Sequence, residues 1–277
     1  MDAQVATEPK RSNAGRVRRI GRISLAVAVA GYLAPLPTLA LVACGLADVS
    51  RHRKRSAELY EKYFTGNGLL TWLLSPVNLL ADLLARRNPG RFALADLPPG
   101  HRAEVEDCIR AFRAHGDRIK AHIAATAGAS RRSMLTFRWY GRTQPTALRI
   151  PEFEREFRQV KTVAVSAFSG RESTSRHFGP LRLTFRVLCN LAPAPDSDSH
   201  IEVDGVTHFW RDDPLFIFDD TFLHQSTNAA DSMRLCLFMD IVRPNRAPWV
   251  FAVAVRATGV IAGSFKRAFY SRWAFIR

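Results

Sequence analysis

The sequence has few cysteines, and none of them form the paired patterns that bind metal. Its 277 residues include only Cys44, Cys108, Cys189 and Cys236, which lie far apart and form no C-x-x-C pair. This spacing argues against a zinc site and gives no disulfide framework. Cys189 and Cys236 lie inside apolar, strand-like runs. We therefore expect reduced thiols in a reducing compartment.

Acidic residues are scarce relative to basic ones. There are 25 Asp and Glu residues against 40 Lys and Arg residues, which gives a formal net charge of +15 at pH 7. Such a balance suits nucleic acid or an anionic membrane surface. The sequence contains no zinc finger, RNP motif or isolated basic helix, so nucleic acid is not expected as a partner. The basic clusters instead flank apolar segments, which favours a membrane surface.

One long run carries no charge at all. Residues 23–47 are apolar enough to span about 30 Å of hydrocarbon as a helix. The run is too long for a signal peptide. Pro35 and Pro37 interrupt it. Two alternatives follow: a kinked transmembrane span, or a hairpin that turns at "APLP" and leaves both basic flanks in the cytoplasm. We predict a basic tail over residues 1–22 and a membrane anchor over residues 23–50.

Two further segments have interfacial character. Residues 67–87 are interrupted at Ser75-Pro76 and predict two short amphipathic helices, either at the membrane interface or at the base of a soluble domain. They belong to a helical region predicted over residues 51–133. Residues 246–277 mix aromatic and basic side chains, which indicates an interfacial helix. The alternative is a helix packed on the domain.

The pattern changes to short β-like runs at Met134. Runs such as "TVAVSAF", "LRLTFRVLCNL" and "RLCLFMDIV" alternate with a period near two, and Asp204-Gly205 is a hairpin signal. These features predict a mainly β fold with flanking helices. In detail, they favour a double-stranded β-helix, or jelly roll, over residues 134–245.

Alternation gives each of these predicted strands one apolar face and one mixed face. Ser166, Arg186 and Arg234 all lie on mixed faces. Such faces either are solvated or line the mouth of a β-roll, where small ligands bind. The stretch "FDDTFLHQSTNAADSMR", residues 218–234, is predicted to be a turn between two strands. An ordinary hairpin needs neither its paired carboxylates nor its histidine.

The stretch from Ser166 to Pro244 resembles the aspartyl/asparaginyl β-hydroxylase family. The matching pieces are "HFGP" beginning at His177, Arg186 nine residues later, "FDDTFLH" ending at His224, and Arg234 ten residues after that. "DIVRP" closes the match, and Ser166 lies eleven residues before His177. The mutually consistent spacing makes the resemblance specific.

The resemblance implies an Fe(II)- and 2-oxoglutarate-dependent dioxygenase that uses O2 to hydroxylate a C–H bond. His177 and His224 would bind Fe(II), which accepts imidazole ligands. Arg234, helped by Ser166, would bind the distal carboxylate of 2-oxoglutarate through paired donors. Arg186 would bind the carboxylate beside the keto group. His177, His224 and Arg234 are therefore the predicted catalytic residues.

Two positions bear on the details of this site. Gly179 stands where many 2-oxoglutarate oxygenases have a carboxylate ligand, but the family includes members with glycine there and only two protein ligands. Leu188 replaces a histidine that is common in the family. Asp219 and Asp220 precede His224 and are expected either to orient it or to cap the turn.

The family includes peptidyl Asp/Asn hydroxylases and bacterial enzymes that hydroxylate acyl chains of lipid A or of ornithine lipids. The apolar segments, and the lack of a repeat domain for gripping a protein, favour a membrane lipid. A peptidyl Asp or Asn residue is the alternative. Outside this chemistry, the alternatives are a non-catalytic, membrane-anchored binding module and a cupin-like zinc or manganese protein.

The resemblance and the thiols also predict a location. Because 2-oxoglutarate is a cytosolic metabolite, we predict a bacterial-type inner membrane protein whose catalytic domain faces the cytoplasm. We also expect that a fragment from near Asp96 to near Asn245 keeps 2-oxoglutarate turnover and loses hydroxylation of membrane lipid.

Overall fold

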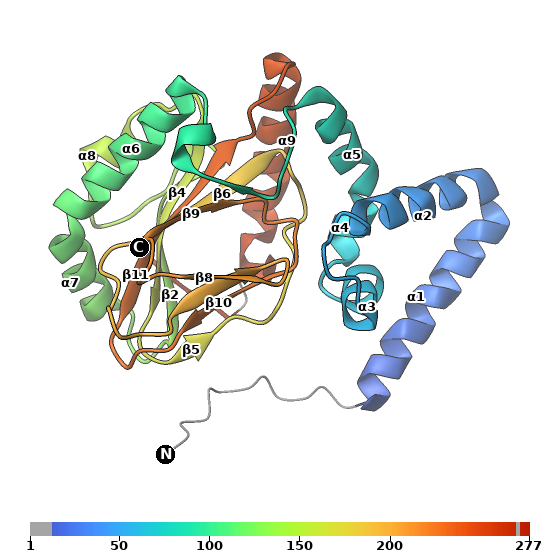
Figure 1. The fold of residues 1–277 in the computed structure, drawn as a ribbon, viewed down its shortest axis with the longest axis horizontal. Helices are drawn as coiled ribbons and strands as arrows, with labels where there is room; N and C mark the ends of the chain where they lie inside the picture. The colour runs from blue at the N-terminus through green and yellow to red at the C-terminus, as the bar shows by residue number, and fades with distance from the viewer. Residues whose placement is uncertain (1–12, 270–271) are drawn as a thin grey trace.

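Two β-sheets form the centre of the molecule, with helices on both sides of them (Figure 1). The computed structural model describes residues 13–269 and 272–277. The larger sheet has eight strands in the order β1-β9-β6-β11-β4-β2-β12, with β3 paired to β2. Its neighbours are antiparallel except β12, which runs parallel to β2. The strands are β1 Arg91–Phe92, β2 Arg132–Trp139, β3 Arg142–Thr143, β4 Val160–Phe168, β6 Thr184–Asn190, β9 Leu215–Phe218, β11 Arg234–Val242 and β12 Ala274–Ile276.

The smaller sheet has four antiparallel strands in the order β5-β10-β7-β8. They are β5 Glu172–Ser173, β7 His200–Val203, β8 Val206–Phe209 and β10 His224–Asn228. Asp204 and Gly205 form the β7–β8 turn with positive φ angles of 52° and 73°, as their sequence predicts. The prediction of a mainly β fold with flanking helices is confirmed.

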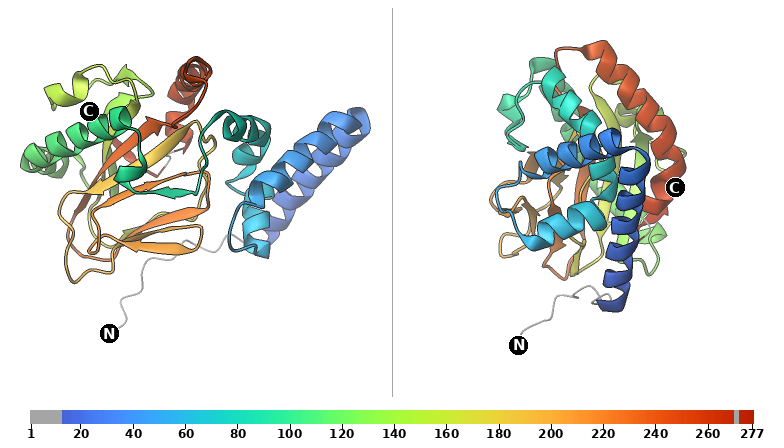
Figure 2. Two further views of the ribbon diagram at one scale, coloured as in Figure 1. Left: turned by 45° about the horizontal axis from the view of Figure 1, so that its top comes forward. Right: turned by 90° about the vertical axis from the view of Figure 1, so that its right-hand side faces the viewer.

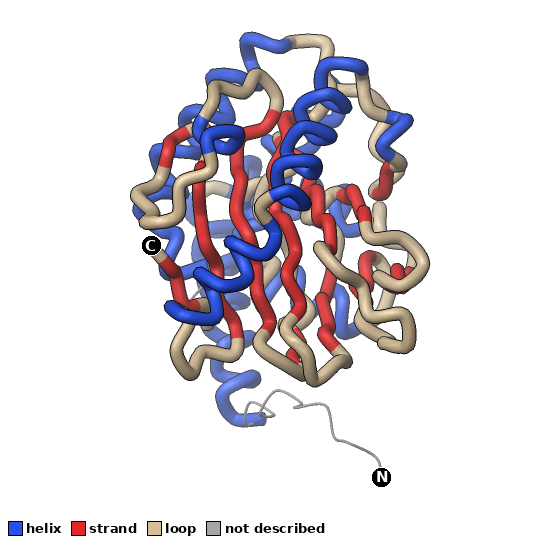
Figure 3. The backbone as a smooth tube through the Cα atoms, turned by 90° about the vertical axis from the view of Figure 1, so that its left-hand side faces the viewer, coloured by secondary structure: helices blue, strands red, loops and turns tan. Residues whose placement is uncertain are grey.

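The two faces of the larger sheet have different partners. Its apolar face, which includes Val165, Val187 and Leu237, packs into a core with the helices on that side. Those helices are α6 Pro99–Ala114, α7 Gly116–Thr126 and α8 Pro151–Glu154, and Figure 3 shows helices crossing in front of the long strands. The mixed face looks toward the smaller sheet. A second core lies between the sheets and includes Cys236 from the larger sheet and Ile201 from the smaller one.

The stretch from residue 218 to residue 234 is not the simple turn that we predicted. The chain leaves β9, crosses to the smaller sheet, forms β10, and returns to the larger sheet as β11. β10 spans only five residues, "HQSTN", and lacks the apolar alternation that marks a strand in sequence. Its pairing partners are distant in sequence, so the tertiary structure specifies this strand.

The apolar run at residues 23–47 is divided between two helices. Helix α1, Asn13–Leu33, and helix α2, Pro35–Val49, are separated at Ala34, whose φ of −144° is not helical. Pro35 opens α2, because proline fits the first turn of a helix and not its interior. At 15 residues, α2 is only about 22 Å long, and α1 carries the basic cluster. None of the helices described is long and apolar enough to cross a membrane.

The next helical region is broken where the sequence predicts. Helix α3, Ala57–Thr65, is followed by α4, Leu69–Leu73, and α5, Ser75–Leu84. Pro76 lies in the first turn of α5. Helices α1 to α5 lie together on the side of the sheets opposite α6 and α7 (Figure 1).

The C-terminal segment is not a single helix. Helix α9, Pro248–Phe269, is followed by β12, which joins the edge of the larger sheet. Trp273, one of the aromatic residues of this predicted interfacial segment, whose rings we expect at headgroup depth, instead packs on Phe168 with ring centroids 5.5 Å apart. The side chains of Phe265, Phe269 and Tyr270, predicted at the same depth, lie outside the described residues. Near the start of α9, Phe251 is buried in a cluster with Val242 of β11. The C-terminal segment is therefore attached to the larger sheet near both of its ends.

Candidate active site

The two predicted metal ligands lie side by side. His224 begins β10, and His177 lies on the segment that follows β5. Their backbones exchange two hydrogen bonds, of 3.0 Å from the His177 N–H and 2.9 Å from the His224 N–H. The centroids of the two imidazole rings are 4.1 Å apart. The structure thus brings together two histidines that are 47 positions apart in the sequence.

The hydrogen bonds of both rings select one tautomer. The Nδ1 atom of His177 is 2.7 Å from the Ser175 carbonyl, and that of His224 is 2.9 Å from the Phe222 carbonyl. A carbonyl only accepts, so each Nδ1 carries the proton and each neutral ring has its lone pair on Nε2. Burial and the neighbouring His177 hold the pKa of His224 well below its usual range. Two imidazoles whose rings are oriented by backbone carbonyls suit a divalent transition metal.

Asp220 occupies the place next to Gly179. A Cβ atom on Gly179 would lie 2.3 Å from Cγ of Asp220 and 2.4 Å from both of its carboxylate oxygens. Asp220 therefore fills the space in which a side chain at position 179 would begin. No group of three or more His, Cys, Asp or Glu side chains in the described part of the chain is arranged as a metal site. Burial, opposed by Arg186, raises the pKa of Asp220 to about 7.

Arg186 joins two carboxylates beside the histidines. Its guanidinium donates to Asp240 at 2.7 Å and to Asp220 at 2.8 Å, and it stacks over the Phe238 ring at 3.9 Å. Asp240 lies opposite Arg186 in the β6–β11 pairing. We had not singled out Asp240, although it shares the mixed face of its strand with Arg234.

Arg234 is buried and has no counter-charge among the residues that the structure describes. Its guanidinium donates to the Thr227 carbonyl and to Ser226 Oγ, both at 2.9 Å. Its Nε has no hydrogen-bond partner, and no ion pair forms on Arg234 within the described residues. The Phe168 ring lies 4.4 Å from the guanidinium carbon. Burial lowers the pKa of Arg234. A buried guanidinium with an unused donor suits an anionic ligand such as a carboxylate.

Ser166 lies on the same face as Arg234. It is opposite Cys236 in the β4–β11 pairing and donates to the Cys236 carbonyl at 3.3 Å. Arg234 is opposite Phe168 in the same pairing. Ser166 and Arg234 therefore lie diagonally across adjacent strands, offset by two residues. Ser166, Arg186 and Arg234 therefore share the face that looks toward the smaller sheet, as the alternation predicts. Ser226 also belongs to this site, but without a recognisable β10 the sequence contained no signal for it.

Asp219 has a different role from Asp220. It is fully buried, and its carboxylate accepts from Asn88 at 2.6 Å and from the Thr221 N–H at 2.9 Å, which caps the turn. Burial alone would raise its pKa, but the charges of Arg51 and Arg182 lower the pKa of Asp219 to about 2.

Arg182 extends these contacts to the N-terminal helices. This fully buried side chain also forms ion pairs with Asp48 of α2 and Asp82 of α5. The buried charges thus connect α2 and α5 to the turn that precedes His224.

Comparison with known proteins identifies the family. A sequence model described as Aspartyl/Asparaginyl beta-hydroxylase matches residues 102–244, more than half of the chain. The chain belongs to this family. Members of the aspartyl/asparaginyl β-hydroxylase family are 2-oxoglutarate-dependent dioxygenases that use Fe(II) and O2. The predictions of the enzyme class and of these cofactors are therefore confirmed at the level of the family.

Two individual proteins are similar to this family member. The ornithine lipid ester-linked acyl 2-hydroxylase of Rhizobium tropici is 32% identical over 90 residues, which are 32% of this chain and 32% of that protein. A crystal structure of an oxidoreductase of the 2OG-Fe(II) oxygenase family from Burkholderia pseudomallei aligns with 59% of this chain and 97% of that one. Its identity is 15% and its TM-score 0.34, so this structural likeness carries no weight in the assignment.

Proposed function

We propose that this protein is an Fe(II)- and 2-oxoglutarate-dependent hydroxylase that acts on the acyl chain of a membrane lipid. The observation that carries the proposal is the pair of adjacent imidazoles, His177 and His224, together with a buried Arg234 that forms no ion pair among the described residues. A metal ligand pair on the smaller sheet and a buried guanidinium on the larger sheet are what binding of iron and of a dicarboxylate requires.

Each residue has a role in this proposal. His177 and His224 hold Fe(II) through Nε2, and the iron, with 2-oxoglutarate and O2, supplies the oxidising chemistry for C–H hydroxylation. Arg234 binds the distal carboxylate of 2-oxoglutarate, with Ser166 beside it. The rings around Arg234 exclude water and so strengthen that charge pair. Arg186 holds Asp220 beside the histidines, and the carboxylate next to the keto group is its predicted ligand.

The finer description of the fold is also part of the proposal. Two facing sheets with the candidate site between them support a double-stranded β-helix, with the oxygenase domain over residues 134–245. The other predicted divisions, at residues 1–22, 23–50, 51–133 and 246–277, remain predictions. The α1–α2 turn agrees with the hairpin alternative for the anchor.

The distribution of exposed apolar side chains supports a lipid substrate. Among the described residues, the exposed large hydrophobic side chains all lie on α1, α2, α4, α5 and α9. Figure 2 shows these helices on one side of the molecule. We call this surface the apolar helical face; it consists of Val17, Leu25, Val29, Tyr32, Leu33, Leu36, Leu39, Leu46, Leu70, Leu73, Val77, Leu80, Leu83, Trp249, Val253 and Val260. Apolar patches of this kind mark membrane or partner surfaces.

The membrane part of the proposal follows from this face. The apolar helical face lies on the bilayer interface, and the basic residues of α1 contact anionic lipid headgroups. The catalytic domain faces the cytoplasm of a bacterial-type inner membrane. The similarity to an ornithine lipid acyl hydroxylase supports a lipid over the alternative substrate, a peptidyl Asp or Asn residue.

Lipid mass spectrometry tests the proposal. Cells that contain the protein should have a membrane lipid whose mass is greater by one oxygen atom, and cells with the His224→Ala variant should lack that species. Hydroxylation of an Asp- or Asn-containing peptide by the purified protein, with no change in any lipid, would establish the peptide alternative instead.

A further inference from the structure

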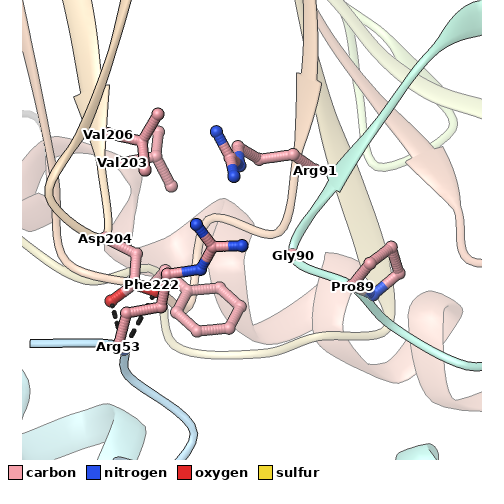
Figure 4. Close-up of a pocket in the computed structure, with 8 residues that line it drawn as sticks. All are labelled: Arg53, Pro89, Gly90, Arg91, Val203, Asp204, Val206 and Phe222. Carbon is pink, nitrogen blue, oxygen red and sulfur yellow. Dashed lines mark hydrogen bonds between the residues drawn. The ribbon is translucent and has the colours of Figure 1, made fainter.

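A small pocket lies at the edge of the roll, between the β7–β8 turn and β1. Figure 4 shows its lining: Arg53, Pro89, Gly90, Arg91, Val203, Asp204, Val206 and Phe222. Three separate parts of the chain meet here, namely the segment after α2, the segment before β1, and the hairpin of the smaller sheet. None of these residues is a predicted ligand of iron or of 2-oxoglutarate.

The pocket adjoins the candidate active site. Val203 is the direct partner of His224 in the β7–β10 pairing. The carbonyl of Phe222 accepts the hydrogen bond that orients the His224 ring. The Phe222 ring itself forms one wall of the pocket. A molecule bound in this pocket would therefore lie beside residues that directly contact His224, a predicted iron ligand.

Two arginine side chains point into the pocket. Figure 4 shows the guanidinium groups of Arg53 and Arg91 among the groups that line the pocket, with that of Arg53 drawn above the Phe222 ring. Neither side chain forms an ion pair with any described carboxylate. The one carboxylate in the lining, Asp204, accepts the backbone N–H of Arg53 at 3.1 Å to each oxygen. The Asp204 carboxylate interacts electrostatically with both arginines, so the lining holds two positive charges against one negative charge, and a bound anion would balance the excess.

We propose that Arg53 and Arg91 form a binding subsite for the anionic headgroup of the lipid substrate. The inference rests on the proposed function, which it makes more specific. An oxyanion, either a carboxylate or a phosphate, accepts from both guanidinium groups. Val206, which is partly exposed, then contacts the apolar part of the lipid next to the headgroup. Arg53 follows α2 directly, so the subsite lies where the N-terminal hairpin joins the catalytic roll.

Binding of short-chain lipids to the full-length protein tests the subsite without any need for turnover. The probes are dihexanoyl phosphatidic acid for a phosphate, N-hexanoylglycine for a carboxylate, and dihexanoyl phosphatidylcholine as a lipid without net charge. Titration calorimetry is performed in detergent below the critical micelle concentration of each probe. The variants are Arg53→Gln, Arg91→Gln and the double variant. The matched control is Arg142→Gln, an exposed arginine on β3 outside the pocket.

We expect at least one anionic probe to bind the wild-type protein more tightly than phosphatidylcholine. A lost charged hydrogen bond should weaken that binding about tenfold for each arginine, and about a hundredfold in the double variant. Arg142→Gln should bind as the wild type does. The preferred anionic probe identifies the headgroup as phosphate or carboxylate.

Two results would overturn the subsite: equal binding of anionic and uncharged probes by the wild type, or unchanged binding in the double variant. A different result would disprove the proposed function. A wild-type protein that binds the anionic probe through both arginines, but never hydroxylates lipid, would retain the subsite and lose the lipid hydroxylase assignment. A wild-type protein that hydroxylates lipid normally but does not bind the anionic probe would retain the lipid hydroxylase assignment and lose the subsite.

Discussion

Each side chain at the candidate site makes contacts that no neighbouring side chain could make in its place. Two imidazoles are oriented by carbonyls, and one guanidinium is buried without an anion. Asp220 is buried next to a glycine that has no room for a side chain. Substitutions at these positions should therefore produce distinct losses that can be measured separately.

The histidines provide the first prediction. His177→Ala and His224→Ala should each abolish Fe(II) binding and 2-oxoglutarate turnover, because the remaining imidazole alone holds the metal weakly. Equilibrium dialysis with Fe(II), and succinate formation, measure the two effects. His122→Ala on α7 is the control, since that residue lies on the helical side of the larger sheet. Normal succinate formation in either site variant would disprove the iron assignment.

The second prediction concerns the cosubstrate. Arg234→Ala should raise the 2-oxoglutarate concentration needed for half-maximal turnover far more than Arg234→Lys does. Removing one partner of a buried charge pair costs on the order of 3–5 kcal/mol, whereas lysine keeps the charge and loses only the second donor. Titration of 2-oxoglutarate against succinate release measures this. Identical titrations for Arg234→Ala and the wild type would place the distal carboxylate elsewhere.

The third prediction uses the glycine beside Asp220. Gly179→Ala should strongly reduce turnover, because the new methyl group would overlap the Asp220 carboxylate and force it to move. Gly100→Ala is the matched control, since a Cβ there meets nothing within 4 Å. Succinate release and thermal unfolding of both variants check the effect. If Gly179→Ala and Gly100→Ala are equally active, the placement of Asp220 is unimportant for the reaction.

At the scale of elements, the connection between α2 and the β9–β10 segment is the most consequential contact. His52 follows α2, is buried, and accepts the N–H of Leu223 on Nε2 at 3.2 Å. Its Nδ1 lies 3.0 Å from the Val49 carbonyl. The same segment carries Asp48 and Arg51, which reach Arg182 and Asp219. The N-terminal hairpin is thus attached directly to the residue before a predicted iron ligand.

This connection predicts a pH dependence of stability. Burial is the main reason why the pKa of His52 falls from 6.5 to about 4. The unfolded chain therefore binds a proton between pH 6.5 and 4 that the folded protein does not. Stability should fall by on the order of 3 kcal/mol as the pH drops through that window. In thermal unfolding followed by circular dichroism, His52→Gln should lose less stability over the same window. Parallel curves for the two proteins would contradict this assignment.

At the scale of the whole molecule, helices on opposite sides of the two sheets have different surroundings. Helices α6 and α7 cover the apolar face of the larger sheet, while the apolar helical face lies on the other side of the molecule. The buried ion pairs change our expectation for a fragment from Asp96 to Asn245. Such a fragment lacks Asp48 and Asp82, so Arg182 would keep only Asp219 of its three carboxylate partners. We now expect that fragment to be unstable.

The last prediction therefore uses the full chain. Leu36→Glu, Leu39→Glu and Leu83→Glu, combined, should reduce binding to anionic vesicles and hydroxylation of membrane lipid, because charged side chains resist transfer into the interface. Turnover of 2-oxoglutarate without lipid should stay near the wild-type rate. Ala124→Glu with Ala125→Glu, both exposed on α7, is the control. Vesicle cosedimentation measures the binding. Unchanged binding in the triple variant would remove the apolar helical face from the proposed membrane contact.

The sequence by itself determined the features that depend on spacing along the chain. Alternation in β4, β6 and β11 is local, so it predicted which residues share a face, and the paired sheets follow it. Proline acts on its own backbone, so Pro35 and Pro76 marked the breaks between helices. Only the tertiary structure decided how distant segments meet. β10 exists through its partners β5 and β7, and Asp220 meets Gly179 across 41 positions. Arg53 and Arg91 line one pocket because the segment after α2 and the segment around β1 meet in the folded protein, and no local pattern records such contacts.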